Sequence, residues 1–227
     1  MSSRADWAEK HLRYRFKDPA LLERALTHRS ASRDNNERLE YLGDSFLSFA
    51  TARRLYDLRP HDDEGDLSRA RAALVKQATL ATIGQRLQLD AQVILGPGEL
   101  RSGGAQRVAV LADAVEALIG AVLLDGGAAA AEALIDLLFA AELANLPDAA
   151  TLKDPKTRLQ EWLQGNGFRL PIYGVQSVSG RDHEQTFIVT CSVEEKDAHT
   201  TGRGSSRRHA EQEAAAAMLS VLTGEQP

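Results

Sequence analysis

Residues 35–47 read N-N-E-R-L-E-Y-L-G-D-S-F-L, and this pattern predicts a helix with one acidic face. Glu37, Glu40 and Asp44 are three and four positions apart, so on an α-helix they fall within one narrow arc, with Tyr41 beside them. The opposite arc is the expected core stripe: Leu39, Leu42, Phe46 and Phe49. Taken alone, an acidic arc opposite an apolar stripe favours an ordinary solvated helix face over a functional site.

A second helix, predicted over residues 107–124, changes this balance. In its stretch V-L-A-D-A-V-E-A-L-I-G-A-V-L-L the only charged residues are Asp113 and Glu116, which share a face with Gly120. The other positions are apolar all round, which is typical of a buried helix, and Gly120 would let another helix approach closely. Burying two like charges is costly unless something compensates them, and no lysine or arginine lies on this stretch.

The two acidic faces are expected to meet and form one cluster. The four carboxylates of this cluster are Glu40, Asp44, Asp113 and Glu116. A divalent cation is the natural compensation, and Mg²⁺ or Mn²⁺ suits a site built only from oxygen ligands. Such a site indicates a phosphodiester hydrolase. The alternative is that an arginine from elsewhere, Arg69 or Arg71, neutralises the acids.

The composition indicates a soluble protein and gives no sign of a nucleic-acid partner. The 227 residues are 43% hydrophobic and 26% charged, without an apolar run that could cross a membrane or an apolar signal segment at the N-terminus. Cys191 is the only cysteine, which excludes an internal disulfide and a cysteine-based zinc cluster and favours a reduced, cytoplasmic protein. There is no P-loop, and no organic cofactor is expected. With a net charge of −5, RNA binding would need a local basic patch.

The hydrophobic pattern predicts an all-α domain followed by a small α+β domain. Residues 1–146 read as successive helices, the longer ones over 36–58, 66–88, 107–124 and 128–146, without a strand signal between them. An acidic stretch, D-D-E-G-D at 62–66, begins one of them, where the acids also favour the helix dipole. Residues 147–153 are the expected linker. Residues 154–224 predict the order α-β-β-β-α, with helices at 157–165 and 206–222 and strands at 172–179, 185–193 and 198–203.

The last predicted helix begins with the local basic patch. Arg203, Arg207 and Arg208 occur without an acid among them, and G-R-G-S-S at 202–206 precedes the helix. Backbone amides and the positive end of a helix can bind a phosphate beside these arginines. A solvated helix start with serine N-caps explains the same residues, but the surrounding α-β-β-β-α order favours RNA.

Several sequence blocks, in order, resemble the bacterial ribonuclease III family. They are N-E-R-L-E-Y-L-G-D-S-F-L (36–47), A-L-T-H-R-S (25–30), D-E-G-D-L-S-R (63–69), G-P-G-E-L-R-S-G-G (96–104) and L-A-D-A-V-E-A-L-I-G-A (111–121). D-P-K-T-R-L-Q-E-W-L-Q (154–164) and G-S-S-R-R-H-A-E-Q-E-A-A (204–215) resemble the double-stranded-RNA-binding domain that follows in these enzymes. The resemblance covers nearly the whole chain.

The resemblance implies a homodimeric endoribonuclease. It would hydrolyse double-stranded RNA to 5′-phosphate and 3′-hydroxyl ends, using Mg²⁺, for which Mn²⁺ can substitute, and would process ribosomal, transfer and messenger RNA precursors. By motif, Glu40, Asp113 and Glu116 look like metal ligands. Asp44 looks like the acid that positions or activates the attacking water, and Glu116 is also essential to catalysis. Glu37 and Glu64 match further acidic positions of the cleavage valley.

The resemblance also implies contacts with RNA and with a second subunit. The expected RNA-binding residues are Thr157, Gln160, Glu161, His183, Ser205, Ser206, Arg207 and Arg208. Tyr41 replaces a phenylalanine that the family places at the dimer interface, so its hydroxyl needs a partner or a route to water. Where the family usually has R-E-S-I before L-A-D, this chain has R-V-A-V at 107–110, which puts local support of the second acidic helix in question. The alternative hypotheses for the function are a non-catalytic RNA-binding protein and a helical hydrolase of small phosphates.

Overall fold

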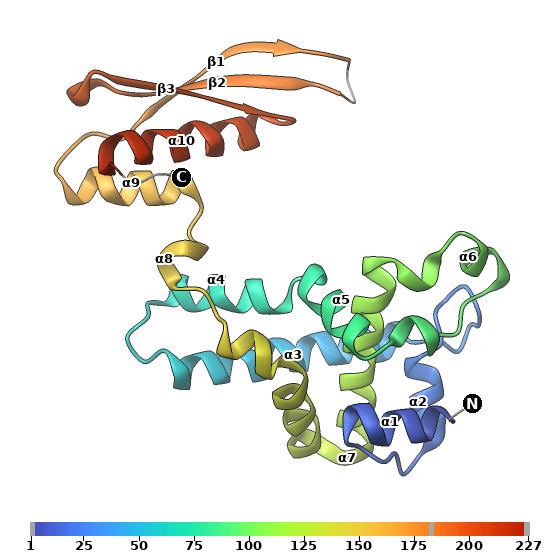
Figure 1. The fold of residues 1–227 in the computed structure, drawn as a ribbon. Helices are drawn as coiled ribbons and strands as arrows, with labels where there is room; N and C mark the ends of the chain where they lie inside the picture. Colours follow the sequence, from blue (N-terminus) through green and yellow to red (C-terminus); the bar gives the residue numbers. More distant parts are fainter. Residues whose placement is uncertain (1–2, 182–183, 225–227) are drawn as a thin grey trace. The chain divides into compact units, whose positions relative to one another are not determined.

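The computed structural model describes residues 3–181 and 184–224, which form two compact units that divide between residues 149 and 150 (Figure 1). The first unit is helical, and the second combines two longer helices with a three-stranded sheet. The predicted fold class, an all-α domain followed by a small α+β domain, is confirmed. Within the described part of the chain, no helix is long and apolar enough to span a membrane.

Seven helices and two short 3₁₀ turns make up the described part of the first unit. They are α1 (Arg4–Leu12), α2 (Pro19–Ala25), α3 (Glu37–Leu58), α4 (Glu64–Val75), α5 (Gln77–Arg86), η1 (Leu89–Ala91), α6 (Pro97–Arg101), η2 (Gly104–Gln106) and α7 (Val108–Ala144). Helix α7 packs against α2, α3 and α5 and supplies half of the buried side chains of the core. The core is therefore built around the helix that carries Asp113 and Glu116.

The predicted core stripe of α3 is only partly right. Leu39 is buried as expected, but the side chain of Phe49 is 60% exposed and Phe46 is only half-buried. The buried positions of α3 instead include Gly43, Leu47 and others further along the helix. The difference arises because α7 crosses α3 at Gly43, so the face that contacts the core is the one that carries this glycine.

The single helix predicted over residues 66–88 is wrong. The backbone of Lys76 is extended (φ −65°, ψ 147°) and separates α4 from α5. The Thr79 hydroxyl donates to the carbonyl of Ala73 at 2.9 Å across this break. Helix α4 packs against α3, whereas α5 packs against α7, so the chain turns to reach a second neighbour. No glycine or proline marks the turn, and the sequence pattern alone did not reveal it.

Helix α7 contains the break that was predicted after Leu124. Gly127 has non-helical backbone angles (φ 80°, ψ 179°), so two helical segments meet there at a kink. Before the kink, every residue from Ala117 to Val122 is buried, which confirms the prediction of a buried helix. Gly127 tolerates this positive φ because it has no Cβ.

The second unit has the predicted α-β-β-β-α order after a short helix. Its elements are α8 (Ala149–Leu152), α9 (Pro155–Gly165), β1 (Ile172–Ser179), β2 (Thr186–Val193), η3 (Glu194–Lys196), β3 (Ala198–Gly204) and α10 (Arg207–Thr223). The strands are antiparallel in the order β1-β2-β3, with an irregularity in β1 between Val175 and Ser177. Helices α9 and α10 lie side by side on one face of the sheet (Figure 1) and bury a small core with it. Helix α8 lies within the expected linker, residues 147–153.

Candidate active site and nucleic-acid interface

The acidic helices α3 and α7 cross at two glycines, almost backbone to backbone. A Cβ on Gly43 would lie 1.8 Å from the carbonyl oxygen of Glu116, and one on Gly120 would lie 2.2 Å from the carbonyl oxygen of Leu39. Neither clash involves a flexible side chain, so only glycine fits either position. The prediction that Gly120 permits a close helix approach is confirmed. The crossing is what brings Glu40 beside the two acids of α7.

Three carboxylates meet at this crossing. Ligand oxygens of Glu40, Asp113 and Glu116 all lie within 4.8 Å of one another, and all three side chains are partly buried. Among residues 3–181 and 184–224, no hydrogen bond or ion pair reaches these carboxylates. Like charges at this separation repel one another, and burial strengthens the repulsion.

The electrostatics of the cluster disfavour the charged form of its carboxylates in the absence of a cation. Burial, the largest cause, and the charges of Asp44, Glu40 and Asp113 together raise the pKa of Glu116 to about 8. The pKa values of Glu40 and Asp113 are also raised, mainly by burial. All three shifts reflect burial, and at Glu40 and Glu116 the neighbouring carboxylates add to it.

The chemistry of these residues fits a divalent cation. Three carboxylates supply hard oxygen donors, and a cation would offset both their burial and their mutual repulsion. Arg69, one candidate for neutralising them, instead bonds Asp66 on its own helix. Arg29 is the nearer cation and lowers the pKa of both Glu40 and Asp113, but its ion pair is with Glu37, at 3.5 Å.

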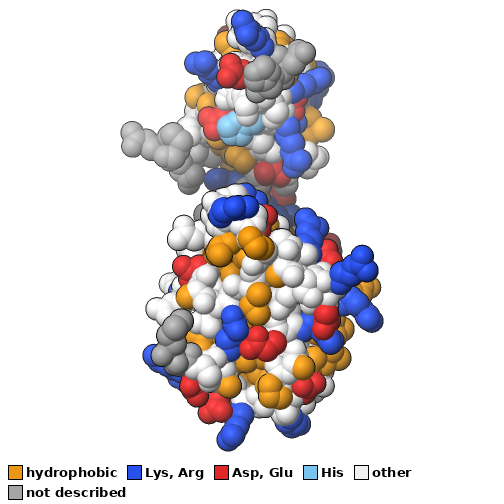
Figure 2. All heavy atoms as spheres, turned by 90° about the vertical axis from the view of Figure 1, so that its right-hand side faces the viewer, with side chains coloured by type: hydrophobic (Ala, Val, Ile, Leu, Met, Phe, Trp, Pro, Cys, Tyr) orange, Lys and Arg blue, Asp and Glu red, His pale blue; other side chains and the backbone are white. Residues whose placement is uncertain are grey.

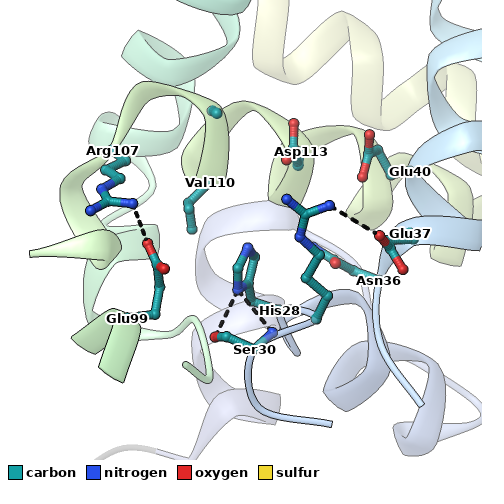
Figure 3. Close-up of a pocket in the computed structure, with 11 residues that line it drawn as sticks. His28, Ser30, Asn36, Glu37, Glu40, Glu99, Arg107, Val110 and Asp113 are labelled. Atoms are coloured by element: carbon teal, nitrogen blue, oxygen red, sulfur yellow. Dashed lines mark hydrogen bonds and ion pairs between the residues drawn. The ribbon is translucent and has the colours of Figure 1, made fainter. Parts of the chain in front are cut away.

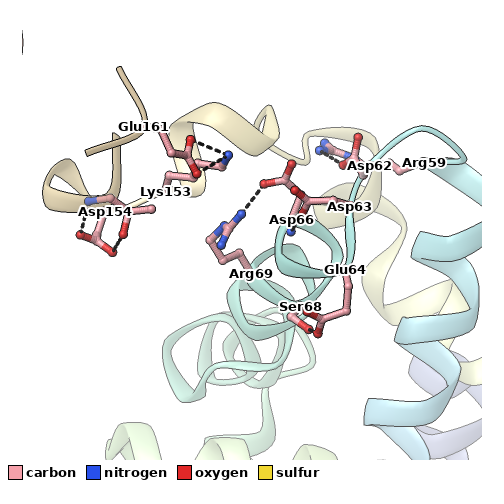
Figure 4. A network of polar contacts seen from close by, with 11 residues as sticks. Arg59, Asp62, Asp63, Glu64, Asp66, Ser68, Arg69, Lys153, Asp154 and Glu161 are labelled. Atoms are coloured by element: carbon pink, nitrogen blue, oxygen red, sulfur yellow. Dashed lines mark hydrogen bonds and ion pairs between the residues drawn. The ribbon is translucent and has the colours of Figure 1, made fainter. Parts of the chain in front are cut away.

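The other predicted acidic residues lie around the cluster or away from it. Asp44 is exposed on α3, and its charge raises the pKa values of both Glu40 and Glu116. Glu37 lines a pocket that adjoins the cluster. Glu64, in the first turn of α4, is exposed and accepts a hydrogen bond from Ser68 at 2.8 Å, outside that pocket (Figure 4).

A cavity of about 530 Å³ adjoins the cluster (Figure 3). Its lining includes Glu40 and Asp113 together with three residues the motif analysis gave no role: His28, Arg29 and Ser30. The Ser30 backbone N–H donates to His28 Nδ1 at 3.2 Å, so in the neutral ring the proton lies on Nε2. Figure 3 shows the ring of His28 lying between its Ser30 contacts and the acids, with Nε2 on the side away from Ser30.

The backbone around His28 is held by a distant segment. His28 N–H donates to the Ile94 carbonyl at 3.0 Å, and Gly96 N–H donates to Ser30 Oγ at 3.0 Å. This places the A-L-T-H-R-S block beside the acidic cluster. The block itself was the only sequence signal for these residues, because a lone loop histidine has no distinctive spacing.

The sequence R-V-A-V at residues 107–110 departs from the family pattern, but the start of α7 is still held in place. Arg107 forms an ion pair with Glu99 at 2.7 Å and donates to Ser102 Oγ at 3.1 Å, which ties the start of α7 to α6 (Figure 3). Val108 and Ala109 are exposed and take no part in these contacts. Arg107 thus supports the start of the second acidic helix, the role the departure had put in question.

Aromatic side chains are exposed along α3. Tyr41, Phe49 and Tyr56 are 77%, 60% and 72% exposed, at spacings that place them along one side of the helix. We call these three residues the α3 aromatic stripe. Large exposed aromatic groups of this kind are typical of a protein interface.

The start of α10 carries the predicted basic patch. Ser205, Ser206, Arg207 and Arg208 are all exposed, and Ser206 caps the helix by accepting a hydrogen bond from His209 N–H at 3.2 Å. On the face of the molecule in Figure 2, basic and acidic side chains are interspersed among those the structure describes.

The structure brings together some of the predicted RNA contacts but not all of them. Thr157 and Gln160 of α9 line one cavity of about 570 Å³ with Arg208 of α10. Glu161 lies outside this cavity and bonds Lys153 at 2.8 Å (Figure 4). His183 lies outside the described residues.

Comparisons with known proteins agree with this division. The Ribonuclease-III-like family model matches residues 18–143, more than half of the chain, and the double-stranded RNA binding motif matches residues 155–222. "Ribonuclease 3" of Nitrosococcus oceani is 51% identical over 218 residues, 95% of this chain and 94% of that protein. "Ribonuclease 3" of Delftia acidovorans is 54% identical over 211 residues, 93% of each chain.

Solved structures resemble the helical unit. A crystal structure of the nuclease domain of ribonuclease III from Campylobacter jejuni superposes with a TM-score of 0.59 at 38% identity, covering 62% of this chain and 97% of that one. A second structure of that domain, described as flexible in a region involved in dimer formation, has a TM-score of 0.57 at 40% identity, covering 59% and 95%.

Proposed function

Because the chain belongs to the ribonuclease III family, we propose that it is an endoribonuclease that hydrolyses double-stranded RNA at the acidic cluster. The observation that carries the proposal is the group of three partly buried carboxylates, within 4.8 Å of one another, that no hydrogen bond or ion pair from the described residues reaches. A non-catalytic RNA-binding protein would gain nothing from keeping such a costly cluster. The products would carry 5′-phosphate and 3′-hydroxyl ends, and precursors of ribosomal and other structured RNA are the proposed substrates.

Glu40, Asp113 and Glu116 are the proposed ligands of Mg²⁺, or of Mn²⁺ in its place. When bound, the cation neutralises negative charge that develops on the phosphoryl oxygens during hydrolysis. Asp44, exposed beside the ligands, would orient or activate the attacking water. Glu37 and Glu64 are proposed as further acidic residues of the cleavage region.

The second unit would hold the duplex through its shape and its phosphates. Double-stranded RNA is recognised mainly by 2′-hydroxyl and phosphate contacts across its minor groove. We assign minor-groove contacts to α9 and the β1–β2 turn, and phosphate contacts to the start of α10. The proposed residues are Thr157, Gln160, Glu161, His183, Ser205, Ser206, Arg207 and Arg208. The proposed domain boundaries are 1–146 and 154–224, with 147–153 as the linker.

Two copies of the chain are proposed to pair through the α3 aromatic stripe, with Tyr41 at the interface. Exposed aromatic side chains on a helix that also carries Glu40 and Asp44 would place the interface next to the active site. A cytoplasmic location is proposed with this function.

The test is cleavage of a labelled RNA duplex by the full chain, with Mg²⁺ and with EDTA. We expect cutting of both strands with Mg²⁺ and none with EDTA, and binding in both conditions. A matched single-stranded RNA should remain intact. Binding without cleavage in the presence of Mg²⁺ or Mn²⁺ would refute the enzymatic function and leave only RNA binding.

A further inference from the structure

Glu211 is an acidic residue in an unexpected place. It lies on α10 one turn after Arg207, on the helix start proposed to bind phosphates, and its side chain is only 12% exposed. A negative charge beside a polyanion should weaken binding, because like charges repel. We therefore expect Glu211 to have a role that favours binding by more than this repulsion opposes it.

The carboxylate of Glu211 joins cations from two helices. Lys156 Nζ of α9 donates to Oε2 at 2.6 Å, and Arg207 Nε of α10 donates to Oε1 at 2.9 Å. These bonds lower the pKa of Glu211, that from Lys156 most of all, so the group is ionised near neutral pH. Each oxygen has a charged donor, which makes this one of the stronger kinds of hydrogen-bonded pair.

The contacts continue to the N-terminus of α9. Gln212 accepts a hydrogen bond from Lys156 N–H at 3.0 Å and donates to Asp154 Oδ1 at 2.8 Å. Asp154 in turn caps α9 by accepting from Thr157 N–H at 3.1 Å. Lys156 Nζ also lies 4.5 Å from the centre of the Tyr173 ring on β1. The starts of α9 and α10 are thus bonded to each other in the wall of one cavity, which Asp154, Lys156, Glu211 and Gln212 line together with Thr157, Gln160 and Arg208.

We infer that Glu211 is a positioning residue for duplex RNA binding, holding Lys156 and Arg207 so that the starts of α9 and α10 present their RNA contacts at a fixed separation. The inference rests on the proposed RNA-binding function of this unit and assigns Glu211 no contact with RNA. Preorganised contacts bind more tightly than contacts that must be ordered during binding.

The direction in which one mutation changes the affinity for RNA distinguishes a positioning role from simple repulsion. If the charge of Glu211 only opposes RNA, Glu211→Gln removes a negative charge, releases Arg207 and tightens binding. If Glu211 positions the two helix starts, the same change weakens binding even though the protein becomes more positive. Glutamine cannot replace the contacts, because its amide offers one acceptor oxygen where the carboxylate offers two, and its NH₂ group would face a donor.

The experiment measures binding of a labelled RNA duplex to the full-length protein in EDTA over a series of salt concentrations. The variants are Glu211→Gln, Glu211→Asp and the matched control Glu213→Gln, which removes the same charge from an exposed position two residues away. We expect Glu211→Gln to weaken binding by roughly tenfold and to lower the slope of log affinity against log salt by up to about one. Glu213→Gln should strengthen binding by less than about twofold. Glu211→Asp, which keeps the charge, should recover part of the loss.

Thermal unfolding of each variant, followed by circular dichroism, excludes loss of the fold as the cause. In cleavage assays Glu211→Gln should raise KM and leave kcat unchanged. Binding by Glu211→Gln that equals or exceeds that of Glu213→Gln would overturn the positioning role. Failure of the unchanged protein to bind any duplex would instead refute the proposed function itself, so the two failures are distinguishable.

Discussion

Glu116 in the helical unit and Glu211 in the second unit are the same residue type, both partly buried on a helix, yet their pKa values move in opposite directions. Burial and three neighbouring carboxylates raise the pKa of Glu116 to about 8. Bonds from Lys156 and Arg207 lower that of Glu211. The difference lies in the partners: the protein supplies two cations to one carboxylate and none to the other.

This contrast teaches how to interpret a buried acid. A carboxylate with cationic partners is satisfied within the protein and fixes elements in place. A carboxylate that only other acids surround is unsatisfied until something from outside binds, which here is proposed to be a divalent cation. The predictions below test the contrast, beginning with the largest expected effect.

Glu116→Gln should abolish duplex cleavage, by about a thousandfold or more, because it removes one proposed ligand charge from the cluster. Duplex binding in EDTA should stay within about twofold, because the second unit is untouched. Cleavage rates and gel-shift affinities measure the two effects. The control is Glu132→Gln on the same helix, which breaks a 2.9 Å ion pair with Arg53 and should leave cleavage nearly unchanged. Rapid cleavage by Glu116→Gln would show that Glu116 is not a catalytic group.

Gly43→Ala should destabilise the helical unit by about 3 kcal/mol and reduce cleavage, because its Cβ would overlap the Glu116 carbonyl and push α3 from α7. Chemical denaturation measures the loss. Gly98→Ala is the matched control: nothing lies within 4 Å of its Cβ position on α6, and alanine favours a helix there. Equal stability of the two variants would contradict the close crossing.

The pH dependence of stability should differ in sign at the two acids. The folded protein holds the Glu116 proton more tightly than the unfolded chain, so in EDTA the free energy of unfolding should fall as pH rises from about 5 toward about 8. Glu116→Gln or added Mg²⁺ should reduce this fall. Glu211 has a lowered pKa, so its contribution is present above the ordinary pKa of a glutamate and is lost as pH falls through the folded value.

Chemical denaturation at several pH values measures both effects, with Glu211→Gln as the counterpart of Glu116→Gln. A metal-free stability that rises between about pH 5 and about pH 8, and that Glu116→Gln leaves unaltered, would contradict an uncompensated cluster.

Tyr41→Ala should weaken self-association by about tenfold, because a large aromatic group is lost from the proposed interface. Tyr41→Phe, the control, removes only the hydroxyl and should change the dimer dissociation constant by less than about threefold. Sedimentation equilibrium measures both constants. A dimer dissociation constant that Tyr41→Ala leaves unchanged would show that the interface does not include the start of α3.

Arg208→Ala should have the smallest effect, weakening duplex binding a few-fold and reducing the salt slope by about one. Arg208 is exposed and lines the cavity beside Thr157 and Gln160, so one proposed phosphate contact would be lost. Arg169→Ala removes a charge that is also exposed and lies outside α10, and should change the slope less. Identical slopes for the two variants would indicate a diffuse charge effect instead of a defined contact.

Much of the fold followed from local patterns. Asp18-Pro19 begins α2, because an N-cap followed by proline is a strong helix start. The helix predicted from residue 157 begins at Pro155, after the N-cap Asp154. The strand at 172–179 was predicted at its observed bounds. The break at Lys76 was missed, because α4 and α5 pack on different helices and nothing local marks the turn.

The sequence by itself determined which residues are proposed to carry the chemistry. Asp113 and Glu116, alone on an apolar helix, indicated a compensated acidic site, and the ordered motifs indicated the family. Only the tertiary structure decided how the acids meet. It joins Glu40 to them through two glycines 77 positions apart in sequence (120 − 43), and it brings His28 beside the cluster. It also gives Glu211 two cations while leaving Glu116 none, because burial and pairing depend on neighbours that are distant along the chain.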